Sequence, residues 1–182
     1  MISNVEELDA ALDVLEEAKA ELSAAGIPFN AEVKAGVMIE IPAAAVCADL
    51  LAKKADFMSI GTNDLIQYTM AVDRENPKVA HLFDGFNPAV LRLIKQTIEA
   101  GKNTGTEVSM CGEMAGDPAS VLLLMGLGLR SFSMSPSLVM QIKELVRSVT
   151  LTDAQEIAEA AMELSAAREI RKLVQEKLKT YE

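Results

Sequence analysis

Residues 56–68 read DFMSIGTNDLIQY and contain the clearest structural signal in the sequence. An apolar run, residues 57–60, stops at a glycine, and this pattern predicts a short buried strand that ends in a turn. Because glycine lets the backbone turn sharply or approach a ligand closely, Asn63 and Asp64 are expected at the end of that strand. Arg74 follows closely enough to fold back over the same place. A carboxylate, an amide and a guanidinium beside one strand end suit a metal ion and an anion.

Strands and helices alternate on both sides of this stretch. Further apolar runs predict strands at residues 36–39, 107–110 and 129–134. Each predicted strand leads, after a loop, to a proline-started helix, and these prolines are Pro42, Pro88, Pro118 and Pro136. A good N-cap ahead of a proline at the first helical position is a start signal. Residues 67–86 are expected to form a long loop. The alternation is typical of βα units around a parallel sheet.

Both ends of the chain are predicted to be helical. Capping boxes are read at Ser3 with Glu6 and at Thr152 with Gln155. Apolar residues at helical spacing follow each of them. A break at Ser165 divides the C-terminal segment into a helical pair, to which no chemistry is assigned.

The number of strands decides the fold class. Four full strands are predicted, and Met1-Ile2 are interpreted as the remnant of one more. A (β/α)8 barrel needs eight strands and about 250 residues. The chain of 182 residues is therefore assigned to the α/β class, as the later half of a (β/α)8 TIM-type barrel or a small open sheet. The expected domains are a partial barrel over residues 1–150 and barrel-packing helices over residues 151–182.

Composition excludes several classes of protein. The hydrophobic fraction of 50% excludes disorder, and no apolar run approaches the roughly 18 residues of a membrane span. The formal net charge of −10, without a basic cluster, argues against nucleic acid and anionic membranes as partners. The two cysteines lack metal-site spacing and the N-terminus lacks a signal-peptide pattern, so a reducing cytoplasm is the expected location.

Candidate site residues stand where the predicted strands end, because ligands bind at the carboxyl ends of strands in parallel α/β folds. Glu40 and Asp64 belong to successive strands, so their carboxylates could converge on one cation. Two carboxylates plus substrate oxygens are a usual way for a protein to hold Mg²⁺. The alternative is that Glu40 caps the following helix and Asp64 caps a turn.

Cys111 ends another predicted strand, next to a glycine. Its thiol could act as a nucleophile or a proton donor, or it could be a small core residue, which is the role assigned to Cys47. His81, in the long loop, is interpreted as a loop anchor. Arg74 is either an anion clamp or an ordinary surface charge. From the residues alone, the chain supports a magnesium-assisted site for a small anion without naming the reaction.

Several motifs resemble one enzyme family. They are Val37–Ala44, Ser59–Tyr68, Ala71–Arg74, Met110–Gly116 and Phe132–Ser135. In this order and over nearly the whole chain, they resemble enzyme I of the bacterial sugar phosphotransferase system, which is phosphoenolpyruvate–protein phosphotransferase. Pyruvate phosphate dikinase and phosphoenolpyruvate synthase share the barrel and parts of these motifs. The stretches AVDR and CGEMAG are more similar to enzyme I.

The resemblance implies a role for each candidate residue. Glu40 and Asp64 would bind Mg²⁺, and Asn63 with Arg74 would hold the phosphate of phosphoenolpyruvate. Cys111 would protonate the enolate carbon as pyruvate forms. Phosphoryl transfer depends mainly on positioning and on neutralising spread negative charge, which a metal ion and an arginine supply.

The resemblance also implies partners and missing parts. The family's phosphorylated histidine lies in an N-terminal domain absent here, His81 lacks its surrounding motif, and the arginines of the early barrel strands are missing. The expected partners are therefore that phosphohistidine domain and the phosphocarrier protein. The chain alone is expected to be a fragment or truncated product that cannot complete phosphotransfer.

An open half barrel exposes apolar edges, so a homo-oligomer is also expected. Two rival interpretations remain at this point. One is a free-standing magnesium enolate lyase or aldolase, and the other is a non-catalytic binding or oligomerisation module.

Overall fold

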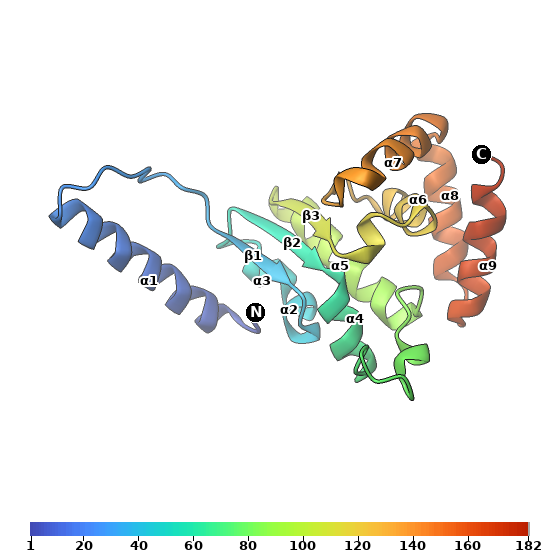
Figure 1. Ribbon diagram of the computed structural model, residues 1–182, viewed down its shortest axis with the longest axis horizontal. Helices are drawn as coiled ribbons and strands as arrows, with labels where there is room; N and C mark the ends of the chain where they lie inside the picture. Colours follow the sequence, from blue (N-terminus) through green and yellow to red (C-terminus); the bar gives the residue numbers. More distant parts are fainter. Residues whose placement is uncertain (182) are drawn as a thin grey trace.

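Four parallel strands form one sheet in the computed structural model, which describes residues 1–181 (Figure 1). The strands are β1 (Gly36–Ile39), β2 (Phe57–Gly61), β3 (Glu107–Cys111) and β4 (Ser131–Phe132), in the order β1-β2-β3-β4. Ile39 lies opposite Ile60, and Gly61 lies opposite Cys111. Since each strand pairs in parallel with the next one in sequence, the carboxyl ends of β1, β2 and β3 meet at one edge. The predicted α/β half-barrel architecture is confirmed.

Helices connect and cover these strands. They are α1 (Val5–Ala24), α2 (Pro42–Val46), α3 (Ala48–Leu51), α4 (Thr62–Met70), α5 (Pro88–Thr104), α6 (Pro118–Leu127), α7 (Pro136–Ser148), α8 (Leu151–Met162) and α9 (Ala167–Leu178), with 3₁₀ turns η1 (Ala80–Leu82) and η2 (Glu113–Ala115). The prolines start α2, α5, α6 and α7 as predicted. Asn87 and Asp117 cap α5 and α6 with their side chains. Within residues 1–181, no helix combines the length and apolar character needed to cross a bilayer.

Helix α6 is buried on every side from Ala119 to Met125. Leu122, Leu123 and Leu124 are completely buried on this helix, because α7, α8 and α9 all pack against it (Figure 1). A helix that is apolar on every side is stable only when it is covered on every side. A Cβ at Gly126 would collide with the backbone oxygen of Ala154 in α8, so glycine permits the close approach of the two helices.

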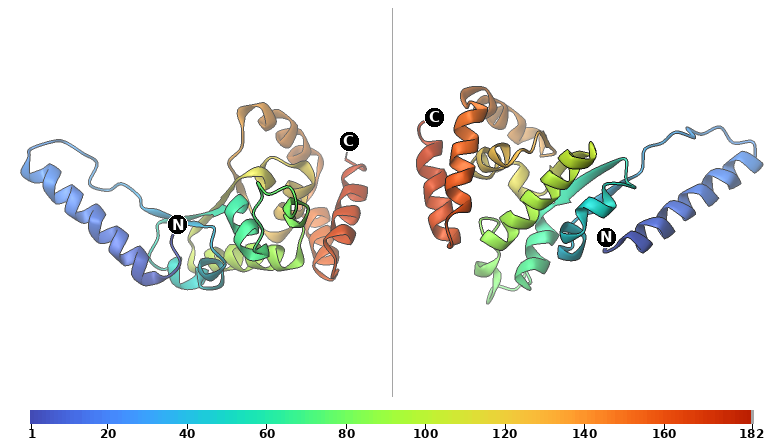
Figure 2. Two further views of the ribbon diagram at one scale, coloured as in Figure 1. Left: turned by 60° about the horizontal axis from the view of Figure 1, so that its bottom comes forward. Right: turned by 180° about the vertical axis from the view of Figure 1, so that it is seen from behind.

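Helix α1 is the least covered element. It stands apart from the sheet and reaches β1 through an extended connection (Figures 1 and 2). Leu8 is its buried residue, and Lys54, just after α3, forms an ion pair of 2.6 Å with Asp9. Farther along, Val14 is 63% exposed. The apolar residues Leu12, Leu15 and Leu22 of the same helix are half-buried, so full burial in α1 is limited to Leu8 near its N-terminal end.

The start of the chain differs from its prediction. Met1-Ile2 lie outside the sheet. The capping box lies one residue later than predicted: the Asn4 side chain accepts from the Glu7 N–H at 2.8 Å, and the Glu7 carboxylate accepts from the Ser3 N–H at 2.7 Å. Asparagine and serine are comparable N-caps, so either residue could start the helix, and Asn4 is the one that does.

The second predicted capping box is wrong as well. Thr150 caps α8, because its hydroxyl accepts from the Asp153 N–H at 3.1 Å, and Thr152 and Gln155 lie inside the helix. The break at Ser165 is confirmed by the end of α8 at Met162 and the start of α9 at Ala167. Both helices pack on α6, while the domain boundary near residue 150 stays a prediction. Glu182 lies outside the described residues.

Three interior expectations also need correction. The loop predicted over residues 67–86 begins later, because buried Leu65 and Ile66 continue a helix to Met70 before Ala71 turns left-handed at φ 52°. The single helix expected after Pro42 is divided at Cys47, which is half-buried rather than a core residue. The last strand is shorter than predicted and comprises only Ser131–Phe132.

Candidate active site

Glu40 lies at the carboxyl end of β1 and is only 7% exposed. A Cβ built at Gly61 would lie 3.0 Å from Glu40 Cβ and 3.1 Å from Glu40 Oε2. The carboxylate of Glu40 therefore lies directly beside the backbone at the end of β2, in space that a larger residue at position 61 would fill. The α-amino nitrogen of Met1 is 3.5 Å from Glu40 Oε1.

Asn63 and Asp64 lie in the first turn of α4, immediately after β2. Both side chains are half-buried. Asn63 Oδ1 accepts a hydrogen bond of 3.2 Å from the backbone N–H of Glu113, which follows β3. Asp64 is the acidic residue of the helix's first turn, where the helix dipole favours negative charge. These positions confirm that the segment begins at a strand end, although it continues as a helix rather than a turn.

Cys111 is the last residue of β3 and is half-buried. Its Sγ atom lies 3.8 Å from Ser59 Oγ and 3.7 Å from the backbone oxygen of Ile60. Its own backbone oxygen accepts from the hydroxyl of Thr62 at 3.1 Å. The thiol is therefore held against β2, one strand away from Glu40.

Gly112 turns the chain from β3 into η2 with φ 91°, a conformation that side-chain-bearing residues rarely adopt. A Cβ there would collide with Thr62 Oγ1 and would lie 3.1 Å from Asn63 Oδ1. Glycine is thus required at this position both for its backbone angle and for space. The turn brings the end of β3 into direct contact with the start of α4.

Arg74 lies outside this cluster, on the exposed loop after α4. Its backbone N–H donates to Gln67 Oε1 at 3.3 Å. Among residues 1–181, its guanidinium forms no ion pair with the candidate carboxylates. His81 is exposed in η1 of the same loop.

The donor set bears on which metal ion the site could hold. The part of the chain that the structure describes contains no group of three or more His, Cys, Asp or Glu residues suited to a metal ion. Zinc sites usually use three or four such ligands. Mg²⁺ is commonly held by one or two carboxylates together with water and substrate oxygens. Glu40 and Asp64, on neighbouring strand ends, fit that smaller requirement.

Sequence reasoning missed three supporting residues. Ser59 and Thr62 contact the Cys111 residue, and Gly112 packs against the start of α4. All three residues lie inside motifs that the sequence made visible, Ser59–Tyr68 and Met110–Gly116. Their partners were not visible, because these contacts depend on the register that places Gly61 opposite Cys111.

The fold and these positions define a class: a parallel α/β domain whose acidic, amide and thiol side chains gather at adjacent strand ends. The family model described as "PEP-utilising enzyme, PEP-binding domain" matches residues 1–151. The chain therefore belongs to this family of phosphoenolpyruvate-utilising enzymes.

Curated relatives point in the same direction. The chain is 49% identical over 175 residues to "Phosphoenolpyruvate-protein phosphotransferase" of Listeria monocytogenes, a match covering 96% of this chain and 31% of the relative. It is 49% identical over 176 residues to the protein of the same name from Haemophilus influenzae, covering 97% of this chain and 31% of the relative. The protein of that name from Staphylococcus carnosus is 44% identical over 176 residues, with the same two coverages of 97% and 31%.

These matches confirm the resemblance that the motifs indicated. The chain spans about 31% of the length of the curated relatives it matches.

Proposed function

We propose that this chain forms the phosphoenolpyruvate-binding part of a phosphoenolpyruvate–protein phosphotransferase, which moves a phosphoryl group from phosphoenolpyruvate to a protein histidine. The observation that carries the proposal is the arrangement at the ends of β1, β2 and β3. Glu40 lies beside Gly61, and the Asn63 side chain accepts from the Glu113 N–H. The match to the phosphoenolpyruvate-binding family supports the choice of ligand.

In this proposal, Glu40 and Asp64 hold Mg²⁺. When bound there, such an ion would supply positive charge that offsets the negative charge of phosphoenolpyruvate. The Asn63 amide donates to a phosphate oxygen, while its Oδ1 remains bonded to the Glu113 N–H. Arg74 lies on a loop, so it reaches the phosphate only when that loop folds toward the strand ends.

Cys111 supplies the proton in the proposed reaction. As the bond between phosphorus and the enol oxygen breaks, the enolate of pyruvate remains, and its methylene carbon takes the proton of the thiol. The thiol is half-buried and rests between Ser59 Oγ and the Ile60 oxygen, so its position is restricted to this edge of the sheet. A thiolate is left on Cys111 and must be reprotonated before the next cycle.

The proposal assigns the phosphoryl acceptor to a separate phosphohistidine domain, with the phosphocarrier protein after it. His81 is exposed in η1 and lies in none of the site contacts described above. The chain alone is therefore proposed to bind phosphoenolpyruvate without releasing pyruvate. A cytoplasmic location agrees with a chemical role for a free thiol.

We also propose that the chain self-associates. Within the described sheet, β1 and β4 are the edge strands, and open edges favour pairing with another chain. Exposed apolar side chains such as Met140, at 74%, add surface that a second copy could cover. A monomeric mass by light scattering at micromolar concentration would contradict this part of the proposal.

Calorimetric titration of the chain with phosphoenolpyruvate, with and without Mg²⁺, tests the function. Binding is expected only with Mg²⁺, and Asp64→Asn should abolish it. Arg74→Met should weaken it, and Asp49→Asn, at an exposed acidic residue of α3, should leave it unchanged. No Mg²⁺-dependent binding by the wild-type chain would reject the proposal, and pyruvate release without another domain would reject the assignment of the acceptor.

A further inference from the structure

We infer that Arg171, on the C-terminal helix α9, is a positioning residue that holds the loop between α4 and α5 and, through it, the turn that follows Cys111. The inference deepens the proposed function, on which its meaning for ligand binding rests. Arg171 lies beyond residues 1–151, the part of the chain that the family model matches. The C-terminal helical pair would then support the site in addition to covering α6.

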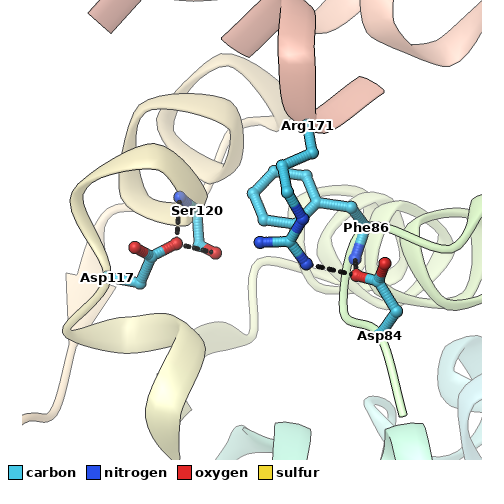
Figure 3. Close-up of polar contacts among 5 residues, drawn as sticks. All are labelled: Asp84, Phe86, Asp117, Ser120 and Arg171. Atoms are coloured by element: carbon cyan, nitrogen blue, oxygen red, sulfur yellow. Dashed lines mark hydrogen bonds and ion pairs between the residues drawn. The ribbon is translucent and has the colours of Figure 1, made fainter. Parts of the chain in front are cut away.

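Arg171 makes two contacts with the end of this loop (Figure 3). Its Nη2 atom lies 2.6 Å from Asp84 Oδ1. Its guanidinium carbon is 4.4 Å from the centre of the Phe86 ring, and Phe86 is only 2% exposed. Asp84 Oδ1 also accepts from the Phe86 N–H at 2.9 Å. One guanidinium thus fixes both the carboxylate and the aromatic ring of a single turn.

The helix that carries Arg171 is firmly placed. Ile170 and Val174 are 1% and 0% exposed, and α9 packs against both α6 and α8. The base of the arginine side chain is therefore fixed by the core. The loop has less support of its own, because residues 73–78 are all exposed.

A continuous set of contacts joins this turn to the candidate active site. A Cβ at Gly85 would lie 2.7 Å from the sulfur of Met114, so the loop backbone packs directly on that side chain. Met114 belongs to η2 and is 5% exposed. The residue before it, Glu113, donates its N–H to Asn63 Oδ1 at 3.2 Å. Displacing the Asp84–Phe86 turn would therefore disturb the turn that orients Asn63.

The same loop also carries Arg74, the proposed phosphate-binding cation. Its two ends are α4, which ends at Met70, and α5, which Asn87 caps through the Ala89 N–H at 2.9 Å. The Arg171 contacts lie just before that cap. They restrict how far the loop can swing away from the strand ends, which favours binding by reducing the entropy lost when the loop orders.

Two substitutions of Arg171 and one matched control test the inference on the intact chain. Arg171→Met keeps an apolar stem over Phe86 and removes the charge, whereas Arg171→Lys keeps the charge. Lys172→Met is the control, since Lys172 is 74% exposed and lies 3.8 Å from Glu176 on the same helix. Amide hydrogen exchange is the first readout and needs no ligand.

Arg171→Met is expected to raise exchange about fivefold at the amides of Phe86 and Glu113, without changing exchange in β2. Arg171→Lys should recover part of the protection, and Lys172→Met should behave as wild type. Unchanged exchange at Glu113 in Arg171→Met, or the same increase in Lys172→Met, would overturn the inference.

Calorimetry with Mg²⁺ and phosphoenolpyruvate is the second readout. Arg171→Met should weaken binding about fivefold, with Arg171→Lys intermediate and Lys172→Met unchanged. Wild-type affinity in Arg171→Met would overturn the role in ligand binding. Absence of binding by the wild-type chain would instead reject the proposed function, and the exchange data would still decide whether Arg171 positions the two turns.

Discussion

Helices α1 and α6 show how differently two apolar patterns are used in one chain. Helix α6 is buried along nearly its whole length, from Ala119 to Met125, because α7, α8, α9 and the turn η2 pack against it (Figure 1). Helix α1 is longer, yet only Leu8 near its start is buried. The difference lies in the neighbours that the fold supplies, since both helices have apolar residues to bury.

The candidate active site lies between these two regions. Cys111 and the η2 turn are on the side where α6 packs against η2, whereas Glu40 follows β1, the strand that α1 precedes. The comparison therefore predicts that changes near α6 cost stability, while comparable changes in α1 cost little. It also predicts that substitutions around Cys111 and substitutions around Glu40 lower stability by different amounts.

The largest expected contrast is between Leu123→Ala in α6 and Val14→Ala in α1. Leu123 is 0% exposed and Val14 is 63% exposed. Leu123→Ala should lower the free energy of unfolding by about 2–5 kcal/mol, because it removes a buried side chain and leaves a cavity. Val14→Ala should change it by less than about 0.5 kcal/mol. Urea unfolding measures both, and equal losses would show that α1 is packed as tightly as α6.

A second contrast separates two reasons why a position requires glycine: limited space and an unusual backbone angle. Gly126→Ala should cost about 1–3 kcal/mol through overpacking, since the new methyl group would collide with α8. A methyl group at Gly26 would meet no atom within 4 Å, but the φ of this residue is 67°. Gly26→Ala should therefore cost about 1–2 kcal/mol through backbone strain alone.

Thermal unfolding measures the loss of stability in each glycine variant, and hydrogen exchange distinguishes the two causes. Gly126→Ala should also loosen α8, seen as faster hydrogen exchange there, and Gly26→Ala should not. A stable Gly126→Ala variant with unchanged α8 exchange would contradict the close helix contact.

A smaller effect is expected where α1 is tied to the rest of the chain. Lys54→Met removes the ion pair with Asp9. The side chains of Lys54 and Asp9 are 42% and 46% exposed. The cost should stay below about 1 kcal/mol, because exposed ion pairs are weak and screened by solvent. Limited proteolysis should nevertheless cut the connection between α1 and β1 faster in Lys54→Met than in the wild type. Cleavage in α6 at the same rate as in this connection would contradict the contrast.

The smallest expected effect is a pH dependence of the stability at the start of α1. Hydrogen bonds from the Ser3 N–H and hydroxyl hold the pKa of the Glu7 carboxyl below its ordinary value of 4.5. A lowered pKa means that this interaction stabilises the start of α1 fully above pH 4.5 and is lost as the pH falls through the lower, folded-state pKa. Acid titration followed by NMR should show α1 fraying at its start, and Glu7→Gln should remove this pH dependence. Fraying that is identical in Glu7→Gln would assign the effect to another group.

Much of the architecture could be predicted from the sequence because its signals are local. Apolar runs located the four strands, and the prolines located four helix starts, since each acts within one or two residues. The caps were misplaced at Ser3 and Thr152 because neighbouring residues, Asn4 and Thr150, could fill the same role. Local pattern alone does not decide between adjacent polar residues.

For the candidate site, the sequence predicted the positions of the residues at the strand ends but not the contacts between them. The strand-end rule placed Glu40, Asn63 and Cys111 at one edge, and the sheet order confirms that placement. The contact of Thr62 with the Cys111 oxygen and that of Asn63 with the Glu113 N–H join residues distant in sequence. Such contacts follow from strand register and from close packing at glycines, neither of which a single sequence displays.

The most direct test of a metal-assisted phosphoenolpyruvate site is electron paramagnetic resonance of Mn²⁺, used in place of Mg²⁺, with phosphoenolpyruvate present. One bound Mn²⁺ per chain is expected for the wild type. In Glu40→Gln its affinity should fall at least about tenfold, while Asp49→Asn should match the wild type. Equal Mn²⁺ affinity in the wild type and Glu40→Gln, or no bound Mn²⁺ in the presence of phosphoenolpyruvate, would contradict the proposed site.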